Sequence, residues 1–81
     1  MNIAECRKYE TQARMLLPPV LHEFLCFEHD GKMVLEALSL DNETRVIAHG
    51  SRNSHPEHAF QECIAQIKVA LDNNLKWTDS K

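Results

Sequence analysis

Glycine is scarce in this sequence, and its scarcity argues against one class of site. Only Gly31 and Gly50 occur among the 81 residues, so the chain has no glycine-rich loop whose backbone N–H groups cradle a phosphate. It also lacks a G-x-S-x-G turn that would expose a nucleophilic serine. Glu23 and Glu28 are separated by an odd number of positions, which places them on opposite faces of one strand. We therefore expect no enzyme activity and no cofactor.

Cysteine pairs and long apolar runs are also missing. The three cysteines, Cys6, Cys26 and Cys63, are odd in number and form no C-x-x-C pair, which disfavours a disulfide framework and a zinc site. No apolar stretch approaches the roughly 18 residues of a membrane helix, and the N-terminal residues are charged where a signal peptide is apolar. These features predict reduced, buried thiols in a cytoplasmic protein without a membrane partner.

Positive charge is not in excess either. Nine Lys and Arg residues stand against twelve Asp and Glu, a net charge of −3, whereas a nucleic-acid-binding domain usually shows a clear basic excess. A chain of this length removes only about 60 to 65% of its unfolded surface from water, so its core is thin. Pairing of two copies would cover a sheet face or edge, and we expect a homodimer.

The hydrophobic period changes along the chain from helical to strand-like and back to helical, which predicts an α+β fold in the order α-β-β-β-α. Both helices are expected on one face of a three-stranded antiparallel sheet, with the opposite face or an edge available to a partner. The whole chain forms a single domain, 1–81. Its predicted elements are a helix at 3–17, strands at 21–29, 32–40 and 44–49, a helix at 55–73 and a short tail at 75–81.

Local signals mark the ends of these elements. Asn2 with Glu5, and Ser54 with Glu57, have the spacing of an N-capping box. The first helix should end before a pair of prolines and the second at Asn74, a candidate left-handed cap. Between the first two strands, an Asp-Gly pair predicts a type I′ hairpin turn.

The strongest amphipathic stripe lies in the second helix and predicts the main packing element. The first strand carries apolar residues on both faces, which predicts a central position in the sheet. The stripe is expected to pack against one face of the strands, either Leu25, Phe27 and Val46 or their opposite-face neighbours. Its residues are Phe60, Ile64, Ile67 and Leu71.

Three histidines near the start of the second helix, His49, His55 and His58, admit two functional interpretations. In the first, they bind a metal together with Cys63 or Asp30; in the second, they form a pH-sensitive or partner-binding surface. Histidines in a capped first turn are commonly only solvated, and we predict no metal.

An acidic surface in the strand region is the preferred binding site, aimed at a basic protein partner; the alternative is a charged, solvated sheet edge. Its acids are Glu23, Glu28, Asp30, Glu36, Asp41 and Glu43. The candidate partner-binding residues are Glu23, Glu28, Glu36, Glu43, Arg45, His49, Arg52, His55, His58 and Trp77.

The element order resembles that of the double-stranded RNA-binding domain over residues 2 to 74. That family carries lysines at the start of its second helix, where this chain has His55, Pro56, Glu57 and His58, and Arg52 is the only fixed cation in the preceding loop. RNA binding is therefore the alternative function.

The segment from Phe24 to Asn74, with its helix start SHPEHAFQECI, is similar to the β-β-β-α core of HicB-like antitoxins, on the strength of Glu57 and Ala59. That resemblance implies inhibition of a partner without autoregulation. In general character the chain is similar to small phage or mobile-element inhibitors, including anti-CRISPR proteins. The sequence thus predicts a non-enzymatic protein-binding module, a small bacterial or mobile-element accessory or inhibitor protein.

Overall fold

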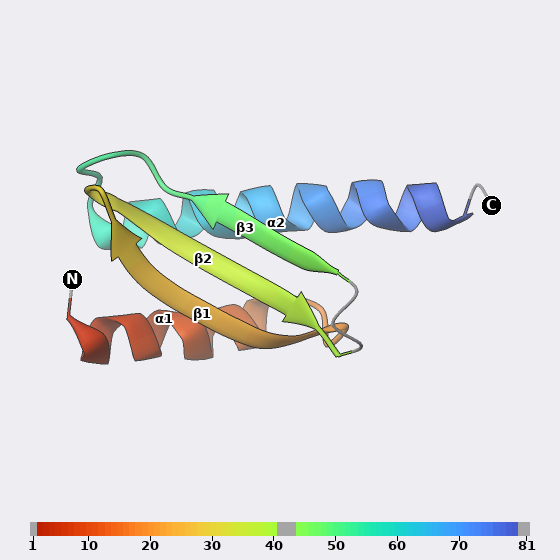
Figure 1. Cartoon of the computed structure of the whole chain (residues 1–81), viewed down its shortest axis with the longest axis horizontal. Coiled ribbons are helices and arrows are strands. Elements are labelled where there is room, and N and C mark those ends of the chain that lie inside the picture. Colours follow the sequence, from red (N-terminus) through yellow and green to blue (C-terminus); the bar gives the residue numbers. More distant parts are fainter. Residues whose placement is uncertain (1, 41–43, 80–81) are drawn as a thin grey trace.

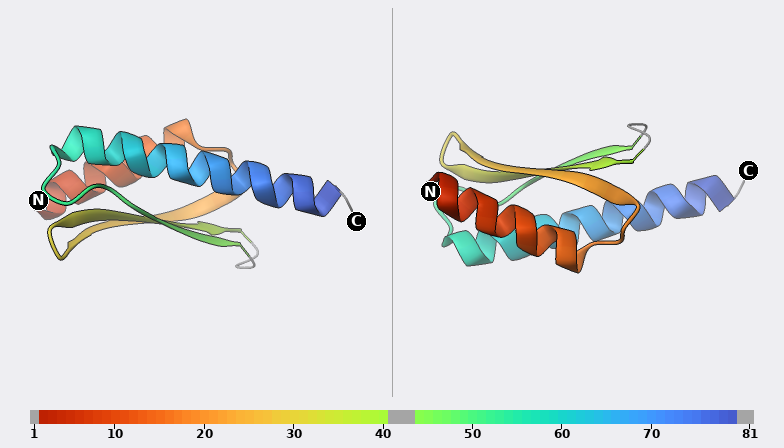
Figure 2. Two further views of the ribbon diagram at one scale, coloured as in Figure 1. Left: turned by 90° about the horizontal axis from the view of Figure 1, so that it is seen from above. Right: turned by 90° about the horizontal axis from the view of Figure 1, so that it is seen from below.

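Two helices cover one face of a three-stranded antiparallel sheet (Figures 1 and 2). The structure is a computed structural model that describes residues 2–40 and 44–79, with side chains up to Asn73. The predicted α+β class and element order are confirmed. The elements are α1 (Ile3–Leu16), β1 (Leu21–His29), β2 (Lys32–Ser39), β3 (Arg45–His49) and α2 (Pro56–Asp79).

The start of α1 follows from its cap. The Asn2 side chain accepts a hydrogen bond of 2.9 Å from the Glu5 backbone N–H, which satisfies one of the free donors at the helix start. At the other end the Leu17 N–H donates to the Ala13 carbonyl, and two prolines then prevent a further turn. The helix ends at Leu16, one residue before the predicted end, and Leu17 is its extended C-cap residue; Leu17 is buried, whereas Leu16 is 48% exposed.

The hairpin between β1 and β2 has the predicted turn. Asp30 and Gly31 both have positive φ, 54° and 74°, as a type I′ turn requires. The turn sets a register in which Leu25 pairs with Glu36, and Glu36 pairs in turn with Ile47 of β3. Three cross-strand neighbours therefore form one row across the sheet.

The position of β1 corrects a prediction. The strand order is β1-β2-β3, so β2 is central and β1 lies at an edge. A strand that is apolar on both faces is expected to be covered on both faces. Here the helices cover only one, and Leu25 and Phe27 on the other remain 52% and 37% exposed.

Both ends of α2 differ from the prediction. Pro56 is its first residue, so the cap position belongs to His55, not Ser54. The helix then continues through Asn73 and Asn74 to Asp79, in place of a left-handed cap and a short tail. An asparagine in a helix costs at most about 0.7 kcal/mol relative to alanine. Without a following glycine or proline, that cost does not end the helix.

The core lies between the sheet and the helices. The α2 stripe packs against the helix-facing residues of the strands, so of the two predicted alternatives the opposite-face neighbours of Leu25 and Phe27 are correct. Tyr9 of α1 meets Phe60 of α2 with ring centroids 4.9 Å apart, which joins the two helices. The strand residues in this cluster are Cys26, Met33, Leu35, Ala37 and Ala48, with Phe24 and Val46 packed against it.

Candidate functional site: the open face of the sheet

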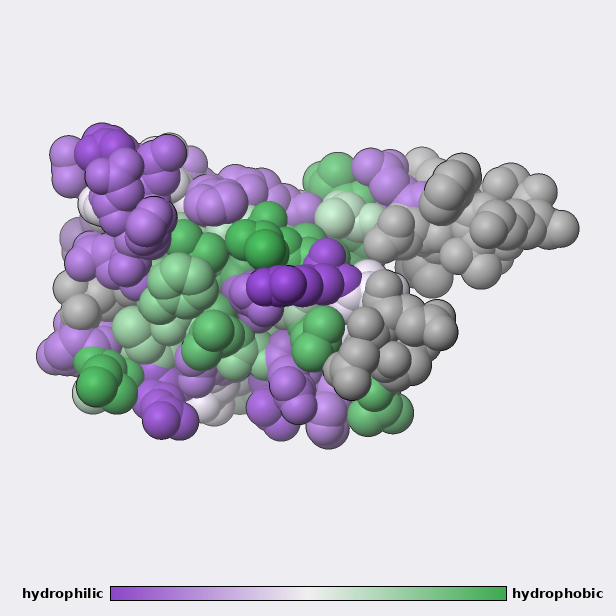
Figure 3. Space-filling model, in the orientation of Figure 1, coloured by the Kyte–Doolittle hydropathy of each residue, from purple (hydrophilic) through white to green (hydrophobic). Residues whose placement is uncertain are grey.

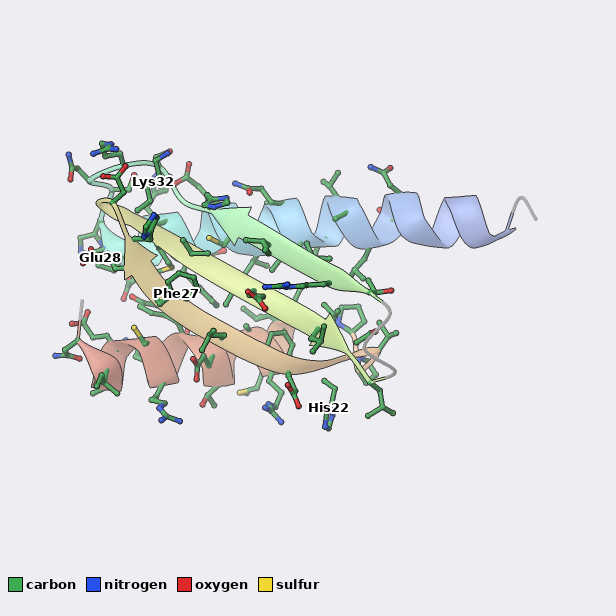
Figure 4. All side chains as sticks on the ribbon, in the orientation of Figure 1. His22, Phe27, Glu28 and Lys32 are labelled. Carbon is green, nitrogen blue, oxygen red and sulfur yellow. The ribbon has the colours of Figure 1, made fainter. Side chains whose placement is uncertain are left out.

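The sheet has one face that no helix covers, here called the open face (Figures 3 and 4). Apolar side chains occupy its middle and polar ones lie among and around them (Figure 3). Strand alternation and the register assign its members. They are Glu23, Leu25, Phe27 and His29 from β1, Lys32, Val34, Glu36 and Leu38 from β2, and Arg45, Ile47 and His49 from β3.

The middle of the open face is apolar and accessible. Leu25, Phe27 and Ile47 are 52%, 37% and 47% exposed, while Val34 between them is buried. A shallow hollow of about 250 Å³ lies beside them, with Glu23, Leu25, Glu36 and Leu38 in its lining. Large apolar side chains gathered on one face of a small protein are typical of an interaction site.

One ion pair crosses the open face. The Arg45 guanidinium donates two hydrogen bonds to the Glu36 carboxylate, of 3.0 and 3.1 Å, across the β2–β3 pair. This bidentate geometry fixes both side chains. Glu23 lies in the same cross-strand row as Arg45, with Leu38 between them. The row therefore carries an acid at the β1 edge and a base at the β3 edge.

Helix side chains form hydrogen bonds with backbone groups at both edges of the sheet. The Glu10 carboxylate accepts the outward Cys26 N–H of β1 at 2.9 Å. The Gln66 amide pairs with β3 twice, accepting the His49 N–H at 3.2 Å and donating to the His49 carbonyl at 2.7 Å. Backbone groups that are bonded in this way are not available to pair with another strand. Part of each edge is therefore already hydrogen-bonded within the protein.

The predicted acidic residues do not form one surface. Glu23 and Glu36 lie on the open face, whereas Glu28 alternates with Phe27 and belongs to the helix-facing side. Figure 4 shows Glu28 and His22 at opposite ends of β1. Asp30, in the hairpin turn, forms a 2.6 Å ion pair with Arg52. Asp41 and Glu43 lie outside the described residues.

The three candidate histidines have different surroundings. His49 lies on the open face at the end of β3, His55 precedes α2, and His58 lies in its first turn. The His55 ring accepts a 3.4 Å hydrogen bond from the Glu57 N–H. Within the described part of the chain, no group of three or more His, Cys, Asp or Glu side chains is placed to hold a metal ion. The side chain of Trp77 lies outside that part.

The loop before α2 is anchored at several points. Ser51 donates from its N–H and hydroxyl to the Glu62 carboxylate, at 3.1 and 2.7 Å, and these bonds lower the pKa of Glu62. Asn53 donates to the Gly31 carbonyl at 2.9 Å. With Arg52 held by Asp30, the cation of this loop is already engaged within the protein.

Sequence reasoning missed the apolar members of the open face, Leu25, Phe27, Leu38 and Ile47. The sequence of β1 does contain an indication of them, because its apolar residues occupy both faces of the strand. Two helices on the same side of the sheet can cover only one of these faces. Taken from the sequence alone, that pattern indicates burial within the chain.

The buried thiols yield a prediction for chemical modification. Burial, with a smaller effect of Cys6, raises the pKa of Cys26 to about 12, and burial raises that of Cys63 to about 11. Cys6 is only half-buried. Since the thiolate is the reactive form, we expect a disulfide reagent at about pH 8 to modify Cys6 first, and the other two only as the protein unfolds.

The same pKa shifts predict a loss of stability in alkali. Both thiols ionise in the unfolded chain near the ordinary value of 9.0 but remain protonated in the fold. The contribution of the two protonated thiols to the free energy of unfolding is therefore complete below about pH 9 and decreases as the pH rises toward 11 to 12.

Time-resolved thiol titration of the wild type and of Cys6→Ser tests the predicted order of modification. Equal rates for all three thiols in the folded protein would contradict it.

The fold defines a two-layer α+β protein with one bare sheet face. No family model, curated protein or solved structure matches the chain in comparisons with known proteins. In the described residues, neither helix is long and apolar enough to cross a membrane.

Proposed function

We propose that this chain is a non-enzymatic protein-binding module that acts through the open face of its sheet. The observation that carries the proposal is the exposure of Leu25, Phe27 and Ile47 on that face. Exposing large apolar side chains side by side is unfavourable unless a partner covers them. An accessory or inhibitor protein, whose activity is binding alone, fits such a surface.

The composition of the open face supports protein as the ligand. An apolar centre with a polar rim is the usual anatomy of a protein interface. Its central carboxylate, Glu36, is already neutralised by Arg45, so a basic partner gains less from Glu36 than a purely acidic surface would offer. Apolar contact is therefore the main source of affinity, and the charges set orientation.

Binding of duplex RNA has less support. Phosphate contacts from Lys and Arg dominate such binding. Arg45 on the open face and Arg52 in the loop before α2 each hold a carboxylate of the same chain. An RNA phosphate would have to compete with Glu36 and Asp30 for them.

The proposal is tested by placing a charge on the open face. Ile47→Lys puts an ammonium group in the apolar centre, while Val69→Lys makes the same change at a residue of α2 that is 60% exposed. We expect Ile47→Lys to reduce partner capture from the native host at least ten-fold, and Val69→Lys to leave it unchanged. Both variants should keep wild-type helicity by circular dichroism. Equal capture by folded Ile47→Lys would rule out the open face.

A further inference from the structure

The residues of the open face also indicate which protein binds there. We propose that the protein on the open face is a second copy of this chain, packed face to face about a two-fold axis that runs along β2. This inference rests on the proposed function, because it uses the same surface. It adds the identity of the partner, the axis and the contacts.

One row of charges on the open face is complementary to itself about this axis. A two-fold interface brings the same patch together twice, so residue i must suit residue j and j must suit i. An axis along β2 places β1 of one copy opposite β3 of the other. Glu23 and Arg45 lie at opposite edges of one row, separated by Leu38. Each Glu23 therefore faces Arg45 of the second copy, and two intermolecular ion pairs form.

The apolar residues meet in the same arrangement. Leu25 and Ile47 lie at opposite edges of the next row, so Leu25 of one copy faces Ile47 of the other. In the row beyond, Phe27 of one copy faces His49 of the other, while Val34, on the axis between them, is already buried within its own copy. Packed sheets lie about 10 Å apart with strands within about 30° of each other, which preserves these oppositions near the axis.

Glu36 also lies near the axis and faces its own equivalent. This contact would be repulsive between two bare carboxylates. Each Glu36, however, accepts two hydrogen bonds from Arg45 of its own copy, so the two meet as neutralised pairs. Arg45 then lies between Glu36 of its own copy and Glu23 of the other.

A two-fold axis across the strands is less suitable. It would lay each strand over its own equivalent in the second copy, with the rows reversed in order. Lys32 would then lie against Leu38, and Arg45 would extend past the last row of the second copy without an acid opposite it. The axis along β2 avoids both mismatches; it instead places Lys32, at the end of β2, opposite its own equivalent, a like-charge contact that weakens the dimer.

The size of the face predicts a reversible dimer. Three strands about 4.8 Å apart and four rows about 6.8 Å apart give a face of roughly 15 by 25 Å. Covering it on both copies buries roughly 750 Å², less than the roughly 1,200 Å² at the lower end of stable specific interfaces and in the range of weak, transient ones. We therefore expect a dissociation constant of roughly 10 to 100 μM.

The experiment exchanges charges across the proposed interface. Glu23→Arg creates a chain with two bases in the row and Arg45→Glu a chain with two acids, so each homodimer brings like charges together. Mixing the two variants restores both opposite-charge pairs. Asp72→Arg, an exposed position on α2, is the matched charge reversal away from the face. Sedimentation equilibrium from about 5 to 500 μM, a range that brackets the expected dissociation constant, measures association of purified proteins.

We expect the wild type and Asp72→Arg to dimerise alike, each open-face variant to associate at least ten-fold more weakly, and their equimolar mixture to regain dimer. Circular dichroism of each variant confirms folding. A monomeric wild type at the highest concentration would overturn the second-copy assignment, while the open face would remain a site for another protein. A dimer unaffected by Glu23→Arg or Arg45→Glu, or a mixture that stays monomeric, would overturn the proposed axis.

Discussion

Replacing Ile67 by alanine is expected to lower the free energy of unfolding by about 2 to 5 kcal/mol, the range for truncating a large buried aliphatic side chain. Ile67 is completely buried in α2 and belongs to the cluster that joins both helices to the sheet. Small domains have only about 5 to 15 kcal/mol of stability in total. The variant should therefore be close to unfolding at physiological temperature.

Urea denaturation followed by circular dichroism measures this change, and Val69→Ala provides the control. Val69 is two positions away in the same helix but 60% exposed, so its truncation leaves no cavity. Its free energy of unfolding should change by no more than about 0.5 kcal/mol. Equal denaturation midpoints for the two variants would mean that the α2 stripe does not face the sheet.

Adding one methyl group at Gly50 is expected to destabilise the fold by about 1 to 3 kcal/mol, as overpacking of a well-packed site does. A Cβ built on Gly50 would lie 2.6 Å from the Ala59 Cβ and 3.0 Å from its Cα. The Gly50 N–H donates to the Met33 carbonyl at 2.8 Å, which holds the backbone in place. The end of β3 and the start of α2 can approach this closely because residue 50 has no side chain.

A double-mutant cycle tests this contact directly. Ala59→Gly alone should cost up to about 1 kcal/mol through its helix propensity. Combined with Gly50→Ala, it removes the methyl group that the new Cβ meets, so the double variant should be more stable than the sum of the single changes predicts. Additive free energies from thermal or urea denaturation would show that the clash is relieved elsewhere.

Local features were predictable because they depend on a few neighbouring residues. Asn2 accepts the Glu5 N–H because a cap is completed within one turn. Asp30 and Gly31 adopt positive φ because a two-residue hairpin demands it. The end of α2 was wrong for the complementary reason: Asn73 and Asn74 only weakly disfavour a helix that is already established.

The candidate site was only partly predictable. Glu23, Glu36, Arg45 and His49 were named from the sequence and do lie on the open face. Their grouping as an acidic surface did not account for the ion pairs, because Glu36 and Asp30 meet Arg45 and Arg52 only through the pairing of separate elements. Leu25, Phe27 and Ile47 were missed, since an apolar residue in a strand looks the same whether its face is covered or bare.

The sequence by itself determined the order and type of the five elements, the turn at Asp30 and Gly31, and the buried stripe of α2, because hydrophobic period and local backbone preference are encoded residue by residue. Only the tertiary structure decided that β1 is an edge strand, that Glu10 and Gln66 occupy groups of the two sheet edges, and that the apolar residues opposite the helices remain uncovered. Those properties depend on which face of the sheet the helices pack against and on contacts between segments far apart in the chain. No local sequence pattern specifies the packing face or these contacts.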